Sequence, residues 1–178
     1  YTLRRSFKNR GGIEGKTICF VGDIRRGRTV RSLARLLRKF TPVHMIFCSP
    51  PEFNMSDDLR SELQADDGVT FEETTDFHGA MGSADAIYMT RIQDEYDSED
   101  GASPKSIAAY SLAYNHLTQL KEDCVIMHPM PRREELDPAI DKDSRAKYWR
   151  QERNGMWTRV ALITMVLDVD HLVVTPEV

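Results

Sequence analysis

Short, almost continuously apolar runs alternate along this chain with amphipathic stretches, and this alternation restricts the available folds more than any other feature. Five runs have strand character: Lys16–Asp23, Val43–Pro50, Val69–Glu73, Ala84–Arg91 and Cys124–His128. A strand that is apolar on both faces is typical of a parallel sheet with helices on each side. The pattern therefore predicts a sheet that is buried on both faces.

The stretches between these runs have helical periodicity. The clearest helix candidate, residues 27–40, places its apolar side chains on one stripe: Val30, Leu33, Leu37 and Phe40. The other candidates are Ser56–Ala65, Asp76–Met81, Ser111–Leu120 and Asn154–Leu167. Strand and helix in turn, with short connections, predict right-handed crossovers. We expect an α/β fold: an open, mainly parallel five-stranded sheet with helices on both faces, a Rossmann-like three-layer sandwich.

Composition narrows the class of protein. A chain of 178 residues with 40% hydrophobic and 29% charged residues is globular and has room for one ordinary core. The longest apolar stretch, Val160–Leu167, is too short to span a bilayer, and a net charge of −4 argues against nucleic acid as a partner. Three cysteines without a C-x-x-C pair predict a reducing, cytoplasmic setting without a disulfide or zinc. We expect no metal and no cofactor.

In open parallel sheets, ligands bind beyond the carboxyl ends of the strands, and three loops occupy that place. The first, VGDIRRGRTVR, puts Arg25, Arg26, Arg28 and Arg31 at a helix start, where the helix dipole disfavours cations. A bound anion would reverse that balance. The alternative is a solvated basic face assisted by nearby acids such as Asp23.

The second loop, YMTRIQDEY, follows the run Ala84–Arg91. Arg91 and Gln93 alternate beyond the strand end, so both side chains can project to one side. A guanidinium beside an amide suits a carboxylate with a polar neighbour. The alternative is a surface ion pair between Arg91 and Asp94 or Glu95.

The third loop, MHPMPR, ends a buried strand with two prolines. Pro129 and Pro131 have no N–H, so the carbonyls around Met130 suit a ligand that donates hydrogen bonds, such as a carbamoyl amide. A rigid turn without a ligand is the alternative. His128 could act as a general base or be a core histidine bonded to backbone. No nucleophile–base pair emerges, so an enzyme with these loops would work by positioning and electrostatics.

Together these three loops and the tail YWRQERNGMWTRVAL closely resemble the carboxyl-terminal half of aspartate carbamoyltransferases, from about Tyr1 to about Asp168. The ornithine relatives fit less well, because their third loop carries Cys where His128-Pro129 stands. The resemblance implies condensation of carbamoyl phosphate with L-aspartate to N-carbamoyl-L-aspartate and phosphate, an early step of pyrimidine synthesis. It also implies a homotrimer of longer chains.

The resemblance assigns substrate contacts to both arginine-bearing loops, and no covalent or acid–base residue to this chain. Arg28 would hold the α-carboxylate of aspartate, with Thr29 as a lesser polar contact. Arg91 would hold the side-chain carboxylate, and Gln93 would assist it.

The same resemblance implies that the backbone carbonyls of Met130 and Pro131 accept hydrogen bonds from the carbamoyl amide, across a cis Met130–Pro131 bond. The sequence also departs from the family. Tyr96 stands where an arginine is usual in the family. Arg25-Arg26 replaces a pair that begins with lysine, and Arg31 replaces a histidine. These departures keep two other readings open: a non-catalytic amino-acid-binding or regulatory relative, and a transcarbamoylase for another amine.

The resemblance also divides the chain. Residues 1–12 would end an interdomain helix, stopped by Gly11-Gly12 as a carboxyl cap, and residues 13–153 would form the aspartate-binding domain. Residues 154–178 would supply a closing helix that packs on an amino-terminal domain, because Val160–Leu167 is apolar nearly all round. A central helix within one domain is the alternative. The chain does not start with Met and lacks the S-T-R-T-R phosphate loop, so we expect an aspartate-binding half that is inactive alone.

Overall fold

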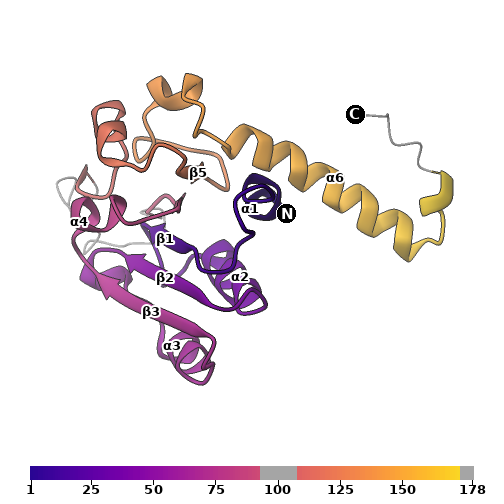
Figure 1. The fold of residues 1–178 in the computed structure, drawn as a ribbon, viewed down its shortest axis with the longest axis horizontal. Helices are drawn as coiled ribbons and strands as arrows, with labels where there is room; N and C mark the ends of the chain where they lie inside the picture. The colour runs from indigo at the N-terminus through magenta and orange to yellow at the C-terminus, as the bar shows by residue number, and fades with distance from the viewer. Residues whose placement is uncertain (93–107, 173–178) are drawn as a thin grey trace, which may run out of the picture.

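The computed structural model describes residues 1–92 and 108–172, and its centre is a parallel sheet with the strand order β3-β2-β1-β4-β5 (Figure 1). Within these ranges the strands are β1 (Thr17–Val21), β2 (Val43–Cys48), β3 (Val69–Thr74), β4 (Ala86–Met89) and β5 (Val125–Met127). Every neighbouring pair is parallel. The predicted α/β class with an open five-stranded sheet is confirmed.

Both faces of the sheet are covered, as the apolar runs predict. One face carries α1 (Thr2–Ser6), α2 (Arg28–Leu37) and α3 (Asp57–Gln64). The other carries α4 (Phe77–Met81) and the 3₁₀ segments Tyr114–Gln119 and Pro138–Lys142. The central strand serves both cores, because successive strand side chains point to opposite faces. Its Ile18 and Phe20 join the first core, and its Cys19 and Val21 join the second.

An aromatic row crosses the first core. The Phe20 and Phe47 rings stack with centroids 5.0 Å apart, and Phe71 meets Phe47 edge to face at 6.2 Å. On the other side of Phe20, the Tyr88 ring lies 5.9 Å away, also edge to face. The row brings the ring of Tyr88 under α2, where its hydroxyl reaches the start of that helix.

The helix predicted over Ser111–Leu120 is wrong in type, since the structure has a 3₁₀ helix over Tyr114–Gln119. Leu112 forms a bridge with Leu136, and its N–H donates to the Glu135 carbonyl at 2.8 Å. This extended backbone moves the start of the helix to Tyr114, three residues later than predicted.

The helices at the two ends of the chain also differ from the predicted bounds. The first helix ends at Ser6, so Gly11 and Gly12 follow a turn instead of capping it. The last helix, α6 (Tyr148–Val166), starts six residues before the predicted Asn154. Tyr148 is fully buried in the second core and anchors this extra part of the helix.

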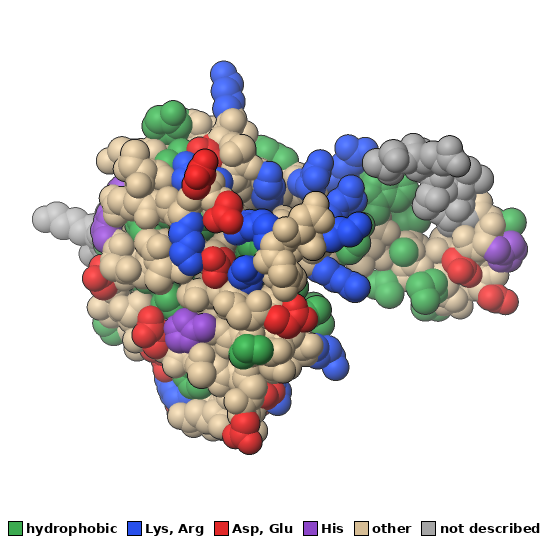
Figure 2. All heavy atoms as spheres, in the orientation of Figure 1, with side chains coloured by type: hydrophobic (Ala, Val, Ile, Leu, Met, Phe, Trp, Pro, Cys, Tyr) green, Lys and Arg blue, Asp and Glu red, His purple; other side chains and the backbone are tan. Residues whose placement is uncertain are grey.

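Beyond this anchor, α6 extends away from the sheet (Figure 1). Asn154 donates to the Thr2 hydroxyl at 2.9 Å, which ties α6 to α1. Farther out its apolar side chains are exposed, with Ile163 59% and Val166 84% accessible, and Figure 2 shows hydrophobic spheres along this end. A central position for this helix is therefore excluded. None of the helices in the described ranges is long and apolar enough to cross a membrane.

Candidate active site

The strand order reverses between β1 and β4, and this creates the crevice in which open α/β sheets bind ligands. β1 leads to β2 on one side, and β4 is followed by β5 on the other. The loop after β1 ends in Arg28, the first residue of α2, and Arg91 lies two residues beyond β4. Tyr88 pairs with Met127, so the Met130–Pro131 loop leaves the same edge.

Direct backbone contact joins the loops that carry the two arginines. The N–H of Thr90 donates to the Val21 carbonyl at 2.8 Å, and the Thr90 hydroxyl donates to the same oxygen at 2.9 Å. Gly22 has φ +112°, and a Cβ built there would lie 2.1 Å from the Thr90 carbonyl oxygen. Glycine is therefore required for the two loops to approach this closely.

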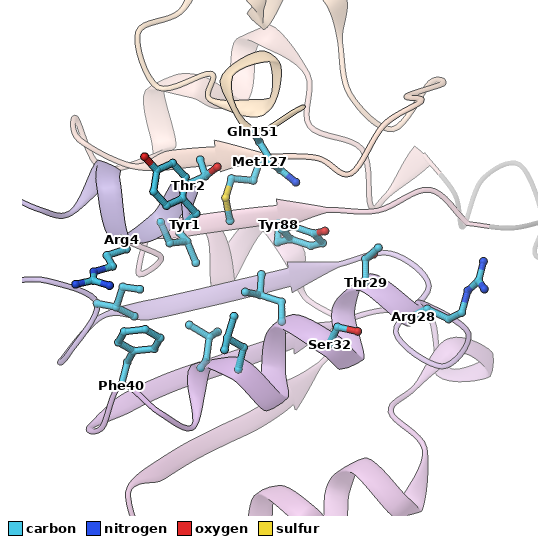
Figure 3. A pocket seen from close by; sticks show the side chains of 15 residues that line it. Tyr1, Thr2, Arg4, Arg28, Thr29, Ser32, Phe40, Tyr88, Met127 and Gln151 are labelled. Carbon is cyan, nitrogen blue, oxygen red and sulfur yellow. The ribbon is translucent and has the colours of Figure 1, made fainter. Parts of the chain in front are cut away.

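The arginines of the first loop divide into two kinds. Arg26 pairs with buried Asp23 at 2.7 Å and lies over the Phe53 ring, while Arg31 pairs with Asp58. Both of these arginines are therefore used in contacts within the fold. For Arg26, the alternative drawn from the sequence, a cation balanced by nearby Asp23, is correct. Arg28 is exposed and makes no ion pair with any residue in the part of the chain that the structure describes. Its guanidinium is directed outward from α2 (Figure 3).

The second loop is described only in part. Arg91 is half-buried. Gln93, the predicted assistant, lies outside the described residues, and so do Asp94 and Glu95, the alternative partners of Arg91, and Tyr96. Their predicted roles stay predictions.

The third loop has the expected backbone. The Met130–Pro131 bond is cis, and Met130 has φ 55°. Within residues 1–92 and 108–172, no N–H donates to the carbonyl of Met130 or Pro131. Pro131 is exposed and Met130 half-buried, so the described chain encloses neither residue.

His128 supports this loop from inside the protein. Its Nδ1 accepts from the Met130 N–H at 2.8 Å, so the ring proton lies on Nε2, which donates to Glu135 Oε1 at 2.8 Å. Burial raises the pKa of Glu135, but hydrogen bonds from His128 and the Arg133 N–H outweigh it, and the net pKa is below its ordinary value. Both ring nitrogens are occupied, so His128 is a core histidine and not a general base.

Two further residues near these loops were not among the predicted contacts. Tyr88 is 5% exposed, and its hydroxyl lies between the side chains of Thr29 and Gln151 (Figure 3). Gln151, on α6, accepts from the His128 N–H at 3.1 Å through Oε1. A tyrosine inside an apolar strand needs a partner for its hydroxyl, and that need was the available signal.

One hollow among the described residues overlaps this site only in part. It has a volume of about 830 Å³ and lies between α1, α2 and the sheet, with Leu33, Leu36 and Phe40 in its wall (Figure 3). Of the predicted contacts it includes only Arg28 and Thr29. An apolar wall does not suit a dianion. The described ranges also hold no group of three His, Cys, Asp or Glu residues that could bind a metal.

Comparison with known proteins gives a consistent result. Residues 14–166 match the family model "Aspartate/ornithine carbamoyltransferase, Asp/Orn binding domain". The chain is 38% identical over 161 residues to the aspartate carbamoyltransferase catalytic subunit of Alkaliphilus metalliredigens, covering 90% of this chain and 52% of that protein. Against the chloroplastic enzyme of Arabidopsis thaliana it is 39% identical, covering 94% and 42%. The chain thus spans about half the length of the curated relatives it matches.

Solved structures agree. The catalytic subunit of M. jannaschii aspartate transcarbamoylase superposes with a TM-score of 0.80 at 31% identity, over 93% of this chain and 54% of that one. Aspartate transcarbamoylase from Trypanosoma cruzi, in complex with N-(phosphonacetyl)-L-aspartic acid, gives 0.79 at 33% identity, over 88% and 51%.

Proposed function

Because the chain belongs to the aspartate/ornithine carbamoyltransferase family, we propose that it is the aspartate-binding half of an aspartate carbamoyltransferase. One observation carries the proposal: the loops that carry Arg28 and Arg91 leave adjacent parallel strands at the reversal of strand order and touch through Gly22 and Thr90. Two cationic side chains on either side of such a crevice suit a small dicarboxylate.

In the proposed complex, Arg28 binds the α-carboxylate of L-aspartate with Thr29 beside it, and Arg91 binds the side-chain carboxylate with Gln93. The aspartate amine then faces carbamoyl phosphate. The carbonyls of Met130 and Pro131 accept hydrogen bonds from the carbamoyl NH₂. Solved structures of the T. cruzi relative with aspartate and phosphate, and with carbamoyl phosphate, support this choice of ligands.

The chemistry asks the protein only to position the two substrates. The deprotonated amine attacks the carbamoyl carbon, and a C–N bond forms. The bond from that carbon to the phosphate oxygen breaks, and phosphate leaves with the electron pair and takes up the proton that the nitrogen loses. Orienting the reactants in this way can contribute about 7–11 kcal/mol of the barrier. The product, N-carbamoyl-L-aspartate, would enter pyrimidine synthesis.

The phosphate-binding groups are proposed to come from an amino-terminal domain, so this chain alone would be inactive. The exposed apolar end of α6, including Leu162, Ile163 and Val166, supports a partner domain at that surface. A homotrimer of the longer protein in the cytoplasm is part of the same proposal, although the Arabidopsis relative is described as chloroplastic.

Domain complementation tests the proposal. The chain is produced alone and together with the amino-terminal half of the A. metalliredigens relative, and carbamoyl transfer to L-aspartate is measured. We expect turnover only from the pair. We expect Arg28→Ala or Arg91→Ala to lower kcat/KM for aspartate at least about 30-fold, as for a lost charge-assisted carboxylate contact.

The matched control is Arg35→Ala, because Arg35 lies on the same helix as Arg28 but pairs with Glu62 at 2.5 Å. It should keep turnover within about twofold of the parent chain. Loss of turnover in the control to the same extent as in Arg28→Ala would contradict the assignment. Equal turnover with L-ornithine would instead favour a transcarbamoylase for another amine.

A further inference from the structure

A continuous run of polar contacts joins the start of α2 to the proline-flanked loop. The Tyr88 hydroxyl lies between the side chains of Thr29 and Gln151 in Figure 3, and hydrogen bonding with both of them lowers its pKa against the effect of burial. Gln151 Oε1 accepts from the His128 N–H at 3.1 Å, and His128 Nδ1 accepts from the Met130 N–H at 2.8 Å. We call these residues the Tyr88 network.

The network connects elements that are far apart in the sequence. Thr29 is on α2, Tyr88 on β4 and Gln151 on α6, while His128 and Met130 follow β5. One end lies beside Arg28, and the other end is the backbone of the loop with the cis bond. The network therefore spans the two ends of the proposed site.

The residues in the middle of the network are buried from solvent, which strengthens the hydrogen bonds between them. Tyr88 is 5% exposed and His128 1% exposed. Burial raises the pKa of Tyr88 above its ordinary value, although both hydrogen bonds oppose this, so the hydroxyl stays protonated at neutral pH. A buried hydroxyl or amide that loses its partner carries the full cost of desolvation, so each member holds its neighbours in place.

We propose that Tyr88 and Gln151 are positioning residues that couple the carboxylate-binding end of the site to the carbamoyl-binding end. This inference rests on the proposed function for the identity of the two ends. Neither residue touches substrate in the proposed complex. Each acts through a neighbour: Tyr88 through Thr29, and Gln151 through His128 and the Met130 backbone. Carbamoyl transfer depends on the distance between the two substrates. The Tyr88 network contacts both loops and therefore fixes their positions relative to each other.

The coupling can be tested on the chain itself, without substrate. Tyr88→Phe removes the hydroxyl and keeps the ring, and Gln151→Met removes the amide and keeps the length. In ¹H–¹⁵N spectra of the chain, we expect each variant to move the amide signals of Thr29, His128 and Met130 together. The double variant should move them no farther than the larger single change, because both break one connected unit.

Tyr110→Phe is the matched control, since Tyr110 is also buried and its hydroxyl donates to the Thr75 carbonyl at 3.1 Å, in the other core. It should leave the network signals in place. The proposal is overturned if Tyr88→Phe moves only the Thr29 signal and Gln151→Met moves only those of His128 and Met130. Independent, additive shifts would show two local contacts and no coupling.

The complementation assay provides a second readout. We expect Tyr88→Phe to lower kcat/KM for aspartate about three- to tenfold with an unchanged melting temperature relative to Tyr110→Phe, as for one lost hydrogen bond. An unchanged kcat/KM would overturn the positioning role. If the unmutated pair shows no carbamoyl transfer, the proposed function fails, while the spectra still decide whether the coupling exists.

Discussion

At the scale of single residues, Gly22 sets how closely the two arginine-bearing loops approach. A Cβ there would collide with the Thr90 carbonyl oxygen, and the backbone has φ +112°. We expect Gly22→Ala to lower the free energy of unfolding by about 1–3 kcal/mol or more in urea titrations. Gly15→Ala is the control, because Gly15 also has positive φ (+73°) with nothing within 4 Å of a built Cβ. Equal losses in both variants would show that contact with Thr90 adds nothing.

The three cysteine side chains are buried, and this burial should make them unreactive. Cys19, Cys48 and Cys124 are buried free thiols, and burial raises the pKa of Cys48 and of Cys124 to about 12. At pH 8 the thiolate fraction of either is then about 10⁻⁴. We expect no reaction of the folded chain with a thiol reagent at pH 8 and full reaction after unfolding. A thiol that reacts rapidly in the folded chain would contradict this burial.

His128 also has consequences that can be measured. It is the hydrogen-bond donor to buried Glu135 and the acceptor for the Met130 N–H. We expect His128→Ala to lower the free energy of unfolding by about 1–3 kcal/mol, since it leaves both groups without a partner. His44→Ala, on β2, is the control, because the His44 ring hydrogen-bonds to the hydroxyl of Thr70, an exposed residue, at 2.8 Å. A smaller loss for His128→Ala than for His44→Ala would contradict its role.

The charge, position and backbone chemistry of single residues were enough to predict the three loops of the candidate site. Charge and position at strand ends identify the loops of Arg28 and Arg91, and missing N–H groups identify the Met130–Pro131 turn. The local sequence offers Asp23 as a partner for Arg26, but it does not reveal that Arg31 is used in a structural pair, because Asp58 comes from a later segment. Tyr88 was missed for the same reason: its partner Gln151 is distant in sequence.

At the scale of elements, ion pairs join α2 and α3, together with the residue that follows α2 and the turn that follows α3. They are Arg31–Asp58, Arg35–Glu62, Arg38–Glu62 and Arg38–Asp66. Hydrogen bonds from these arginines lower the pKa of each carboxyl partner. A pKa that is lower in the folded than in the unfolded chain adds stability above the unfolded value, near 4, and that stability is lost as the pH falls further.

This arrangement predicts a pH- and salt-dependent effect. We expect Arg35→Met to lower the melting temperature slightly at pH 7 in low salt, and much less at pH 3 or in 1 M salt, because exposed pairs are screened. Thermal scans of both proteins across these conditions provide the test. A difference that does not change with pH or salt would show that the Arg35 side chain acts by packing alone.

Strand and helix periodicity predicted the elements whose residues pack only with the sheet. It failed at Ser111–Leu120, where the bridge between Leu112 and Leu136 imposes extended backbone. It also placed the start of α6 too late, because the anchor of that helix is a single buried residue, Tyr148, and not an apolar stripe. In both cases a contact with a distant segment outweighs local pattern.

At the scale of the whole molecule, the outer part of α6 presents apolar side chains that the described chain does not cover. We expect Ile163→Lys to change the free energy of unfolding of the chain by no more than about 0.5 kcal/mol, as at other exposed sites. In contrast, Leu63→Ala in the first core should cost about 2–5 kcal/mol. If the amino-terminal domain covers α6, Ile163→Lys should also abolish complementation; full complementation would place the partner elsewhere.

The central claim is that the loops after β1, β4 and β5 hold one ligand. The most direct test is a crystal structure of the complemented protein with N-(phosphonacetyl)-L-aspartic acid. The account predicts one carboxylate of the aspartyl group within about 3 Å of the Arg28 guanidinium, the other within about 3 Å of Arg91, and the ligand amide against the Met130–Pro131 carbonyls. A ligand bound elsewhere, or guanidinium groups that face apart around it, would contradict the account.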